Sequence, residues 1–141
     1  MKKVVILGGN KLAFYLSCEL QKENYLTFHL SRKFQKKSHL YKFVKLQNYN
    51  FQNLKKKIKD INPEIIINLI SYTGNNLQEC IKVNSKLPNK IIRYCNICKI
   101  SLVLLGSSAE YGITKKNTLQ KGRNLIQYQI MDILNHYKVT M

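Results

Sequence analysis

Acidic residues, proline and tryptophan are scarce in this sequence, and long apolar runs are missing. Of 141 residues, 7 are Asp or Glu, 2 are Pro and none is Trp. No apolar stretch approaches the roughly 18 residues that a membrane-spanning helix needs. The apolar residues 4–7 stop at Gly8-Gly9 and are too few for the core of a signal peptide. These absences predict a cytoplasmic protein with no membrane association.

The four cysteines do not form the pattern of a disulfide scaffold or a metal site. They fall in segments with helical periodicity, and no secretion signal precedes them, which favours reduced thiols. Cys95 and Cys98 form a CxxC pair, but no second pair of cysteines or histidines completes the four ligands of a zinc site. We interpret them as ordinary helix residues and predict no metal.

Positive charge is abundant. The sequence has 24 Lys and Arg and a formal net charge of +17. Such a charge attracts polyanions, and nonspecific polyanion binding is one hypothesis for the function. The lysines are scattered along the whole chain, however, and no nucleic-acid recognition motif is visible. We therefore predict no specific nucleic-acid partner.

Apolar runs that suit buried strands alternate with segments of helical periodicity, and 45% of residues are hydrophobic. The strand-like segments are residues 3–8, 25–30, 43–46, 64–70 and 100–105. The helical segments are residues 12–22, 51–60, 77–98 and 125–136. Pro88 predicts a break or kink in the third of these helices. The alternation predicts an α/β protein with a doubly wound parallel sheet, as one domain over residues 1–141.

In such a sheet, ligands bind beyond the carboxyl ends of the strands, between the first strand and the fourth. The most hydrophobic segment, residues 64–70, is expected in the centre of the sheet. Three stretches should therefore meet at one edge: residues 8–11, 68–72 and 106–112.

Four motifs give the sequence a specific resemblance. They are residues 4–10 (VVILGGN), 63–70 (PEIIINLI), 83–84 (VN) and 106–112 (GSSAEYG). In order and spacing they resemble the extended short-chain dehydrogenase/reductase family, and most of all its NAD(P)-dependent epimerases, dehydratases and reductases of nucleotide sugars. The resemblance implies a Rossmann-like NAD(P)-binding fold without the C-terminal substrate domain. It also implies a nucleotide-sugar substrate, a role in surface polysaccharide synthesis, and a homodimer.

The resemblance also implies a cofactor site. Gly8, Gly9, Asn10 and Lys11 occupy the loop that holds the pyrophosphate at a helix N-terminus. Lys11 and Phe14 stand near the positions of the family's other two glycines, and Phe14 should crowd the helix against the strand. The alternative interpretation of this loop is a plain strand-to-helix turn.

Two further residues complete the implied cofactor site. Arg32 follows the second strand, where an acidic residue would select NAD and an arginine suits the 2′-phosphate of NADP, so NADP is slightly favoured over NAD. A solvated surface arginine is the alternative. Asn84 matches the asparagine of the family's long helix.

The implied catalytic residues are Ser108, Glu110 and Tyr128. Ser108 matches the serine or threonine that hydrogen-bonds the reacting sugar oxygen, and Glu110 matches the acid of the dehydratases. Tyr128 is the tyrosine in the region of the family's Tyr-x-x-x-Lys pair, but Asp132 stands four residues on, where a lysine would lower the pKa of the phenol. A shifted alignment, with Asn124 at the tyrosine and Tyr128 at the lysine, does not restore the pair.

Two hypotheses therefore stand beside polyanion binding. One is an NAD(P)-dependent enzyme acting on nucleotide sugars, truncated and with impaired activity. The other is a non-catalytic remnant or binding module with the same fold.

Overall fold

The computed structural model describes residues 1–9, 11–33 and 38–105, which belong to one compact unit, Met1–Leu105. The predicted single domain over residues 1–141 reaches beyond this part of the chain and stays a prediction. So does the predicted helix at residues 125–136.

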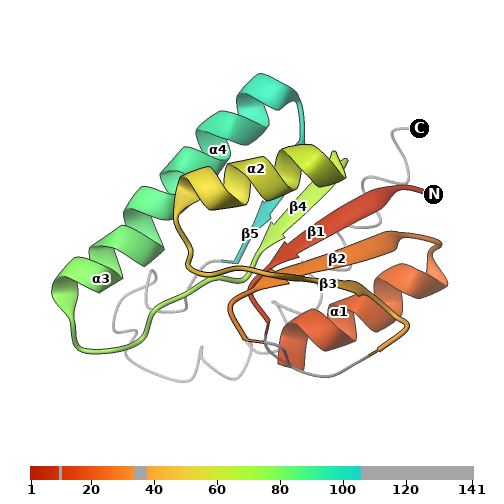
Figure 1. Cartoon of the computed structure of the whole chain (residues 1–141), viewed down its shortest axis with the longest axis horizontal. Helices are drawn as coiled ribbons and strands as arrows, with labels where there is room; N and C mark the ends of the chain where they lie inside the picture. The colour runs from red at the N-terminus through yellow and green to blue at the C-terminus, as the bar shows by residue number, and fades with distance from the viewer. Residues whose placement is uncertain (10, 34–37, 106–141) are drawn as a thin grey trace, which may run out of the picture. The chain divides into compact units, whose positions relative to one another are not determined.

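Five strands form one sheet in which every neighbouring pair is parallel (Figure 1). The strands are β1 (Lys3–Leu7), β2 (Leu26–Ser31), β3 (Lys42–Lys45), β4 (Ile65–Asn68) and β5 (Ser101–Leu104), and their order is β3-β2-β1-β4-β5. The chain runs outward from β1 to β3 and then returns to the other side of β1 for β4 and β5. This reversal between β1 and β4 is the predicted topological switch point, and the predicted fold class is confirmed.

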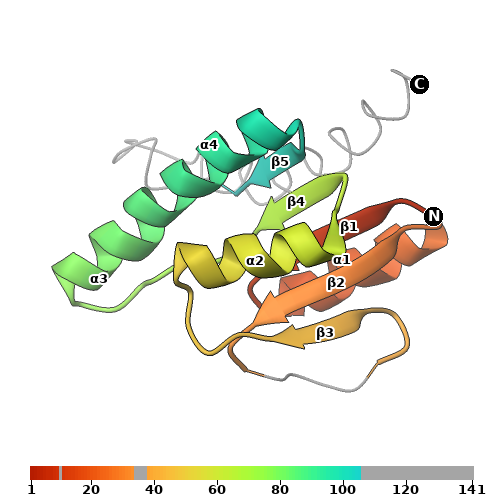
Figure 2. The same cartoon turned by 45° about the horizontal axis from the view of Figure 1, so that its top comes forward.

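Helices connect the strands and cover both faces of the sheet. They are α1 (Lys11–Lys22), α2 (Phe51–Ile61), α3 (Leu77–Ile81) and α4 (Leu87–Cys98), with a π-helical segment, η1 (Lys82–Lys86), between the last two. Figure 2 shows α2 and α4 on one face and α1 on the other. This arrangement is that of a doubly wound sheet, in which the inner strands β1 and β4 are buried from both sides.

The ends of α2 show how local sequence sets the helix boundaries. The side chain of Asn50 accepts a hydrogen bond from the backbone N–H of Gln52 and caps the start. Asn62 adopts the left-handed conformation, with φ of 51°, and its N–H donates to the Ile58 carbonyl. Pro63 follows directly, so the helix ends where the Asn-Pro pair predicted.

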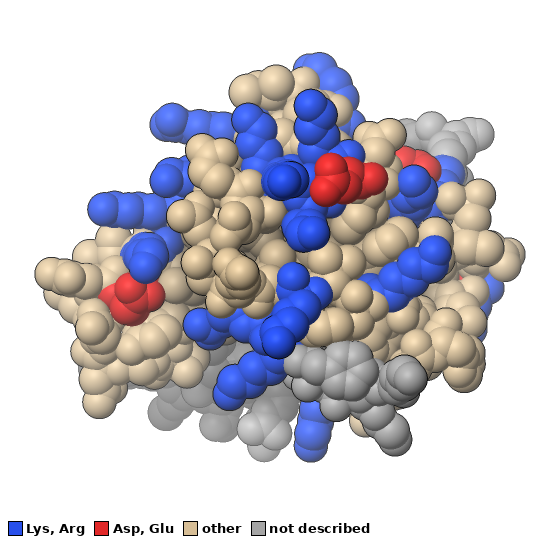
Figure 3. All heavy atoms as spheres, viewed as in Figure 1, with Lys and Arg blue, Asp and Glu red and all other residues tan. Residues whose placement is uncertain are grey.

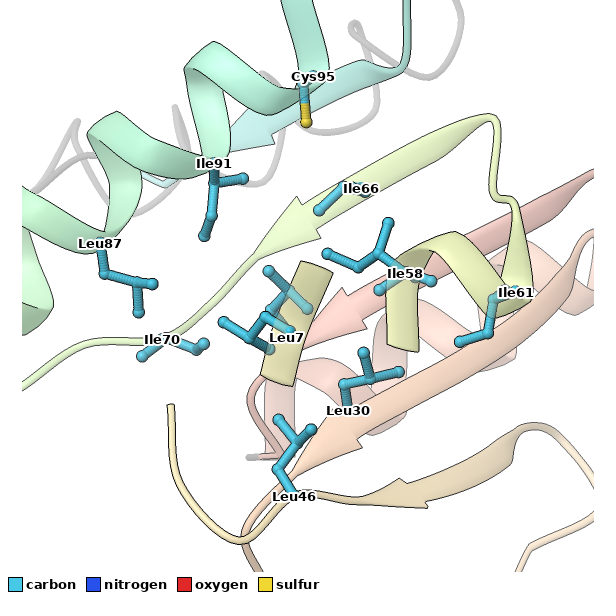
Figure 4. Close-up of a cluster of buried hydrophobic side chains, with 12 residues drawn as sticks. Leu7, Leu30, Leu46, Ile58, Ile61, Ile66, Ile70, Leu87, Ile91 and Cys95 are labelled. Atoms are coloured by element: carbon cyan, nitrogen blue, oxygen red, sulfur yellow. The ribbon is translucent and has the colours of Figure 1, made fainter. Parts of the chain in front are cut away.

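The main hydrophobic core lies between the sheet and the α2–α4 layer. Figure 4 shows Leu7 and Leu30 from the sheet, Ile58 from α2 and Ile91 from α4 pointing into the same space. All four side chains are fully buried, and each burial contributes roughly 1.5–3 kcal/mol. The same cluster contains Val5, Leu46, Leu54, Ile61, Ile66, Ile70, Leu87 and Cys95.

The opposite face of β2 carries polar side chains against α1. His29 is buried, its ring stacks on Tyr41 with centroids 3.8 Å apart, and its Nε2 forms a short hydrogen bond with the Ser17 hydroxyl. Ser17 Oγ also lies 2.9 Å from the Ala13 carbonyl oxygen, to which it can donate. Burial lowers the pKa of His29 to about 4, so the imidazole is neutral at pH 7.

The segments predicted within residues 1–105 agree with the observed elements apart from their ends. The fourth segment is shorter than predicted, because its strand ends at Asn68 and residues 69–70 continue into a loop. It lies beside β1, which occupies the middle of the sheet. The irregularity predicted at Pro88 is present, but as the π-helical segment η1 rather than a break. Pro88 lies in the first turn of α4, directly after this segment.

Positive charge is spread over the surface. Figure 3 shows Lys and Arg side chains across the visible face, with acidic side chains in only a few places. Within the described ranges no helix is long and apolar enough to cross a membrane. Cys95 and Cys98 both lie in α4, as the sequence predicted, and Cys98 is its last residue.

Candidate functional site

The carboxyl ends of β1, β2, β4 and β5 meet at one edge of the sheet, which we call the carboxyl edge. Leu7 pairs in register with Leu30 of β2 and with Asn68 of β4, and Asn68 pairs with Leu104 of β5. The strands therefore end at the same level. Gly8, Arg32, Leu69 and Leu105, the first residues after these strands, are therefore brought together here.

Gly8 makes the turn out of β1, and only glycine fits its position well. Its φ is +97°, a conformation that side chains disfavour. A Cβ atom would lie 3.2 Å from both the carbonyl carbon and the carbonyl oxygen of Leu69. The Gly8 N–H donates to the Leu30 carbonyl oxygen at 2.9 Å, and the Leu69 N–H donates to the Leu7 carbonyl oxygen at 2.8 Å. The turn is thus held between β2 and β4 with no space for a side chain.

Helix α1 begins at Lys11, two residues after Gly9, so its N-terminus lies at the carboxyl edge. The positive end of the helix dipole and an exposed lysine are therefore near the turn. The crowding predicted from Phe14 is wrong. Ala13 is the residue buried against the sheet, while Phe14 is half-buried and its ring lies edge-on to Tyr15. A small residue thus supplies the close helix–sheet packing.

Arg32 immediately follows β2 and is held by an aromatic ring. Its guanidinium carbon lies 4.6 Å from the centroid of the Tyr49 ring. Tyr49 is half-buried against the hydrophobic core, and its hydroxyl lies 3.5 Å from the hydroxyl of Ser31. Because Tyr49 belongs to the connection between β3 and α2, this contact joins two neighbouring strand ends.

Asn84 connects the long helix to the loop after β4. Its side-chain oxygen accepts from the Tyr72 N–H, and its amide nitrogen donates to the Tyr72 carbonyl, both at 2.8 Å. Asn84 lies within η1, and π-helical turns often occur at functional sites. Asn68, at the end of β4, accepts from the Ile70 N–H at 3.3 Å. Together these amides fix the backbone of the β4 loop.

The comparisons with known proteins decide the lineage. The sequence matches the model of the NAD dependent epimerase/dehydratase family over residues 4–139. The chain belongs to this family. The resemblance drawn from the sequence motifs is confirmed. No curated protein matches the sequence significantly.

Several solved structures share the fold at low sequence identity. WbmH of Bordetella bronchiseptica, solved with NAD+, has a TM-score of 0.69 and 13% identity, over 83% of this chain and 42% of its own. The ADP-L-glycero-D-manno-heptose-6-epimerase of Helicobacter pylori has a TM-score of 0.69 and 14% identity, over 83% and 42%. The dTDP-glucose 4,6-dehydratase of Bacillus anthracis, solved with NAD, has a TM-score of 0.65 and 18% identity, over 83% and 41%. This chain spans about two fifths of the length of these proteins.

The predicted site residues of this epimerase/dehydratase chain divide into two groups. Gly8, Gly9 and Lys11 lie at the turn after β1 and Arg32 at the end of β2, while Asn84 contacts the loop after β4. Asn10, Ser108, Glu110 and Tyr128 lie outside the described residues. The first group shares one edge of the sheet, and the roles predicted for both groups remain predictions.

Residues 68–72 were expected at this edge, but three contacts found here were not predicted from the sequence. Tyr49 lies under Arg32, Asn68 shapes the end of β4, and the backbone of Tyr72 is the partner of Asn84. The contact of Asn68 could have been predicted from the sequence, because a polar residue ends the most hydrophobic strand. No local signal marks Tyr49 or Tyr72, because their partners lie 12 or more residues away.

Two features of the carboxyl edge fit a bound dinucleotide. The backbone at Gly8 has no space for a side chain, as expected of a turn that lets a pyrophosphate approach a helix N-terminus. The end of β2 carries Arg32 and Lys33, and the sequence has no Asp or Glu from residue 24 to residue 59. The end of β2 is therefore cationic.

Proposed function

We propose that this chain binds a nicotinamide dinucleotide at the carboxyl edge and acts as an NAD(P)-dependent epimerase or dehydratase on nucleotide sugars. The observation that carries the proposal is the turn at Gly8. Its positive φ and its close approach to Leu69 place a side-chain-free backbone between the ends of β1 and β4, directly before α1. This is the position at which doubly wound sheets bind a pyrophosphate.

In this proposal Gly8, Gly9 and Asn10 contribute backbone to the pyrophosphate site, and Lys11 adds a cation at the start of α1. Arg32 faces the adenosine ribose. Asn84 acts indirectly, by holding the loop after β4 through Tyr72. A bound nicotinamide would supply hydride-transfer chemistry, and the chain's own groups would bind and orient the reactants.

We propose a preference for NADP over NAD. A carboxylate at the end of β2 would accept hydrogen bonds from the two ribose hydroxyls of NAD and repel a 2′-phosphate. Here that position carries Arg32 and Lys33. Family membership supports dinucleotide binding in general, and the cations at this position support the finer preference.

The substrate is proposed to be a nucleotide sugar destined for surface polysaccharide, with the chain acting as a homodimer. Two of the similar structures are named for an ADP-heptose epimerase and a dTDP-glucose dehydratase, which supports this substrate class. Ser108 would hydrogen-bond the reacting oxygen, with Glu110 and Tyr128 as acid and base.

A second candidate function is dinucleotide binding without turnover. The observation that favours it is Asp132, which stands where the family has the lysine that activates its tyrosine. A carboxylate near Tyr128 would raise the pKa of the phenol, whereas proton transfer near neutrality needs it lowered.

Binding is tested by calorimetric titration of the chain with NADP, NAD and duplex DNA over a series of salt concentrations. We expect NADP binding to persist at salt concentrations that abolish DNA binding, because only the nonspecific complex depends entirely on released counterions. If neither dinucleotide binds at low salt, the proposed function is wrong. If DNA and NADP affinities fall in parallel, polyanion binding explains both.

Turnover is tested separately with the dinucleotide and a panel of UDP-, dTDP- and ADP-sugars, by following new sugar products chromatographically. Products support the enzyme, and their loss in a Ser108→Ala variant supports the role of Ser108. Tight dinucleotide binding with no product from any sugar supports the binding module instead.

A further inference from the structure

Among the described residues, Arg32 is the arginine that lies at the carboxyl edge, and its side chain contacts an aromatic ring. The guanidinium carbon stands 4.6 Å from the Tyr49 ring centroid. The ring itself is anchored twice, by packing against the hydrophobic core and by the 3.5 Å approach of its hydroxyl to Ser31. An exposed arginine ordinarily samples many rotamers, so this contact reduces the conformational entropy that ligand binding would remove.

The contact with Tyr49 leaves the hydrogen-bonding capacity of Arg32 intact. A cation over an aromatic ring interacts with the π-face of the ring, so the five N–H donors of the guanidinium need no oxygen acceptor for this contact. Among the described residues, the ion pairs are Glu19–Lys22 and Glu79–Lys82, and neither includes Arg32. Within that part of the chain, Arg32 is therefore presented as an oriented donor with no carboxylate competing for it.

The charges around Arg32 favour an anion at this point. Lys33 follows it, and Lys45 of β3 pairs in register with Ser31, so it lies at the same level of the sheet. Phosphate is the anion whose geometry an in-plane guanidinium matches, through paired N–H donors.

We propose that Tyr49 is a positioning residue, which orients Arg32 toward a phosphate monoester on the adenosine ribose and thereby sets the preference for NADP over NAD. The inference rests on the proposed function, because it assigns the adenosine half of the dinucleotide to the end of β2. It adds that the preference depends on an aromatic ring beneath the arginine as well as on the arginine's charge.

The test compares dissociation constants for NADP and NAD in wild type, Tyr49→Leu and Tyr49→Phe. Tyr49→Leu keeps an apolar side chain against the core but removes the ring, and we expect about a threefold to fivefold loss of NADP affinity with NAD affinity unchanged. Tyr49→Phe keeps the ring and should keep the wild-type ratio of NADP affinity to NAD affinity. Arg32→Gln removes the charge and should lower NADP affinity by about tenfold or more.

Tyr94→Leu is the matched control. Tyr94 is also half-buried against the same core and lies beneath a cation, with Lys55 Nζ 5.8 Å from its ring centroid, but it belongs to α4. Its loss should leave the NADP-to-NAD ratio unchanged. If Tyr49→Leu does not fold, Arg32→Lys tests the same contact from the surface, because a lysine keeps the charge but cannot stack as a plane.

The inference is overturned if Tyr49→Leu lowers the affinities for NADP and NAD equally, or changes neither. Where Tyr49→Leu does not fold, the inference is overturned if a folded Arg32→Lys variant keeps the wild-type ratio of NADP affinity to NAD affinity. Failure of the proposed function gives a different result, in which wild type binds neither dinucleotide. Adenosine 2′-phosphate and adenosine 5′-phosphate then serve as probes, because they need neither the glycine turn nor the nicotinamide. A preference for the 2′-phosphate that Tyr49→Leu removes supports the inference, and its absence in wild type overturns it.

Discussion

Gly8 combines two constraints, a positive φ and contact with the backbone of a neighbouring strand. Either one alone disfavours a side chain, and together they explain why this residue makes the turn after β1. The second constraint involves Leu69, 61 positions later in the sequence, so it depends on the arrangement of the strands.

We predict that Gly8→Ala destabilises the chain by about 2–3 kcal/mol, through the disfavoured φ and the clash with Leu69. Urea unfolding measures the change. Gly74→Ala is the control, because its φ is not positive and the nearest atoms belong to the movable ring of Tyr72. Equal losses in the two variants would contradict the explanation.

His29 should make stability depend on pH. Burial lowers its pKa from 6.5 to about 4 in the folded chain, so between these values the unfolded chain binds more protons. We therefore predict that stability falls by about 2–3 kcal/mol as pH drops from about 6.5 to about 4, and levels off below.

The measurement is urea unfolding at a series of pH values in wild type, His29→Leu and His39→Gln. His29→Leu should flatten the dependence in this window, whereas His39→Gln should leave it unchanged because His39 is exposed. A wild-type slope that survives in His29→Leu would assign the dependence to other groups.

At the scale of elements, the contact of η1 with the loop after β4 holds part of the carboxyl edge. The Asn84 side chain forms hydrogen bonds with both the N–H and the carbonyl of Tyr72, the two backbone groups that would pair with a neighbouring strand in a sheet. The helix thereby stabilises a loop that belongs to no regular element.

We predict that Asn84→Ala costs about 1 kcal/mol and speeds hydrogen exchange at the Tyr72 amide by about fivefold, because both bonds are solvent-exposed and contribute modestly. Ser85→Ala, an exposed neighbour in the same segment, serves as the control. Unchanged protection of Tyr72 in Asn84→Ala would show that other contacts hold the loop.

At the scale of the whole molecule, positive charge works against compactness. A net charge of +17 creates repulsion in the folded state, and the two ion pairs of the described residues are both exposed and offset little of it. Figure 3 shows Lys and Arg side chains across the visible face rather than in one patch.

We predict that moderate salt raises the melting temperature of the chain, because a Debye length near 8 Å screens repulsion between lysines on neighbouring helices. Melting curves in sodium chloride, compared with an equal osmolality of sucrose, separate screening from solute exclusion. A melting temperature that falls as salt is added would contradict this view.

Local patterns in the sequence determined most of the fold. The apolar runs of β1 and β4 predicted strands buried on both faces, Asn62-Pro63 predicted the end of α2, and Gly8 predicted the turn at the switch point. These features follow from hydrophobic periodicity and backbone chemistry, which act over a few neighbouring residues. The position of Arg32 at the carboxyl edge followed in the same way from the end of a strand.

Only the tertiary structure decided which side chains meet. The contacts of Arg32 with Tyr49, Asn84 with Tyr72 and Ser17 with His29 join residues 12 or more positions apart. The burial of Ala13 in place of Phe14 depends on the rotation of α1 about its axis. These contacts depend on strand register, on the path of the loops and on the rotation of the helices. Packing of the whole core selects all three, so local sequence patterns cannot predict the contacts.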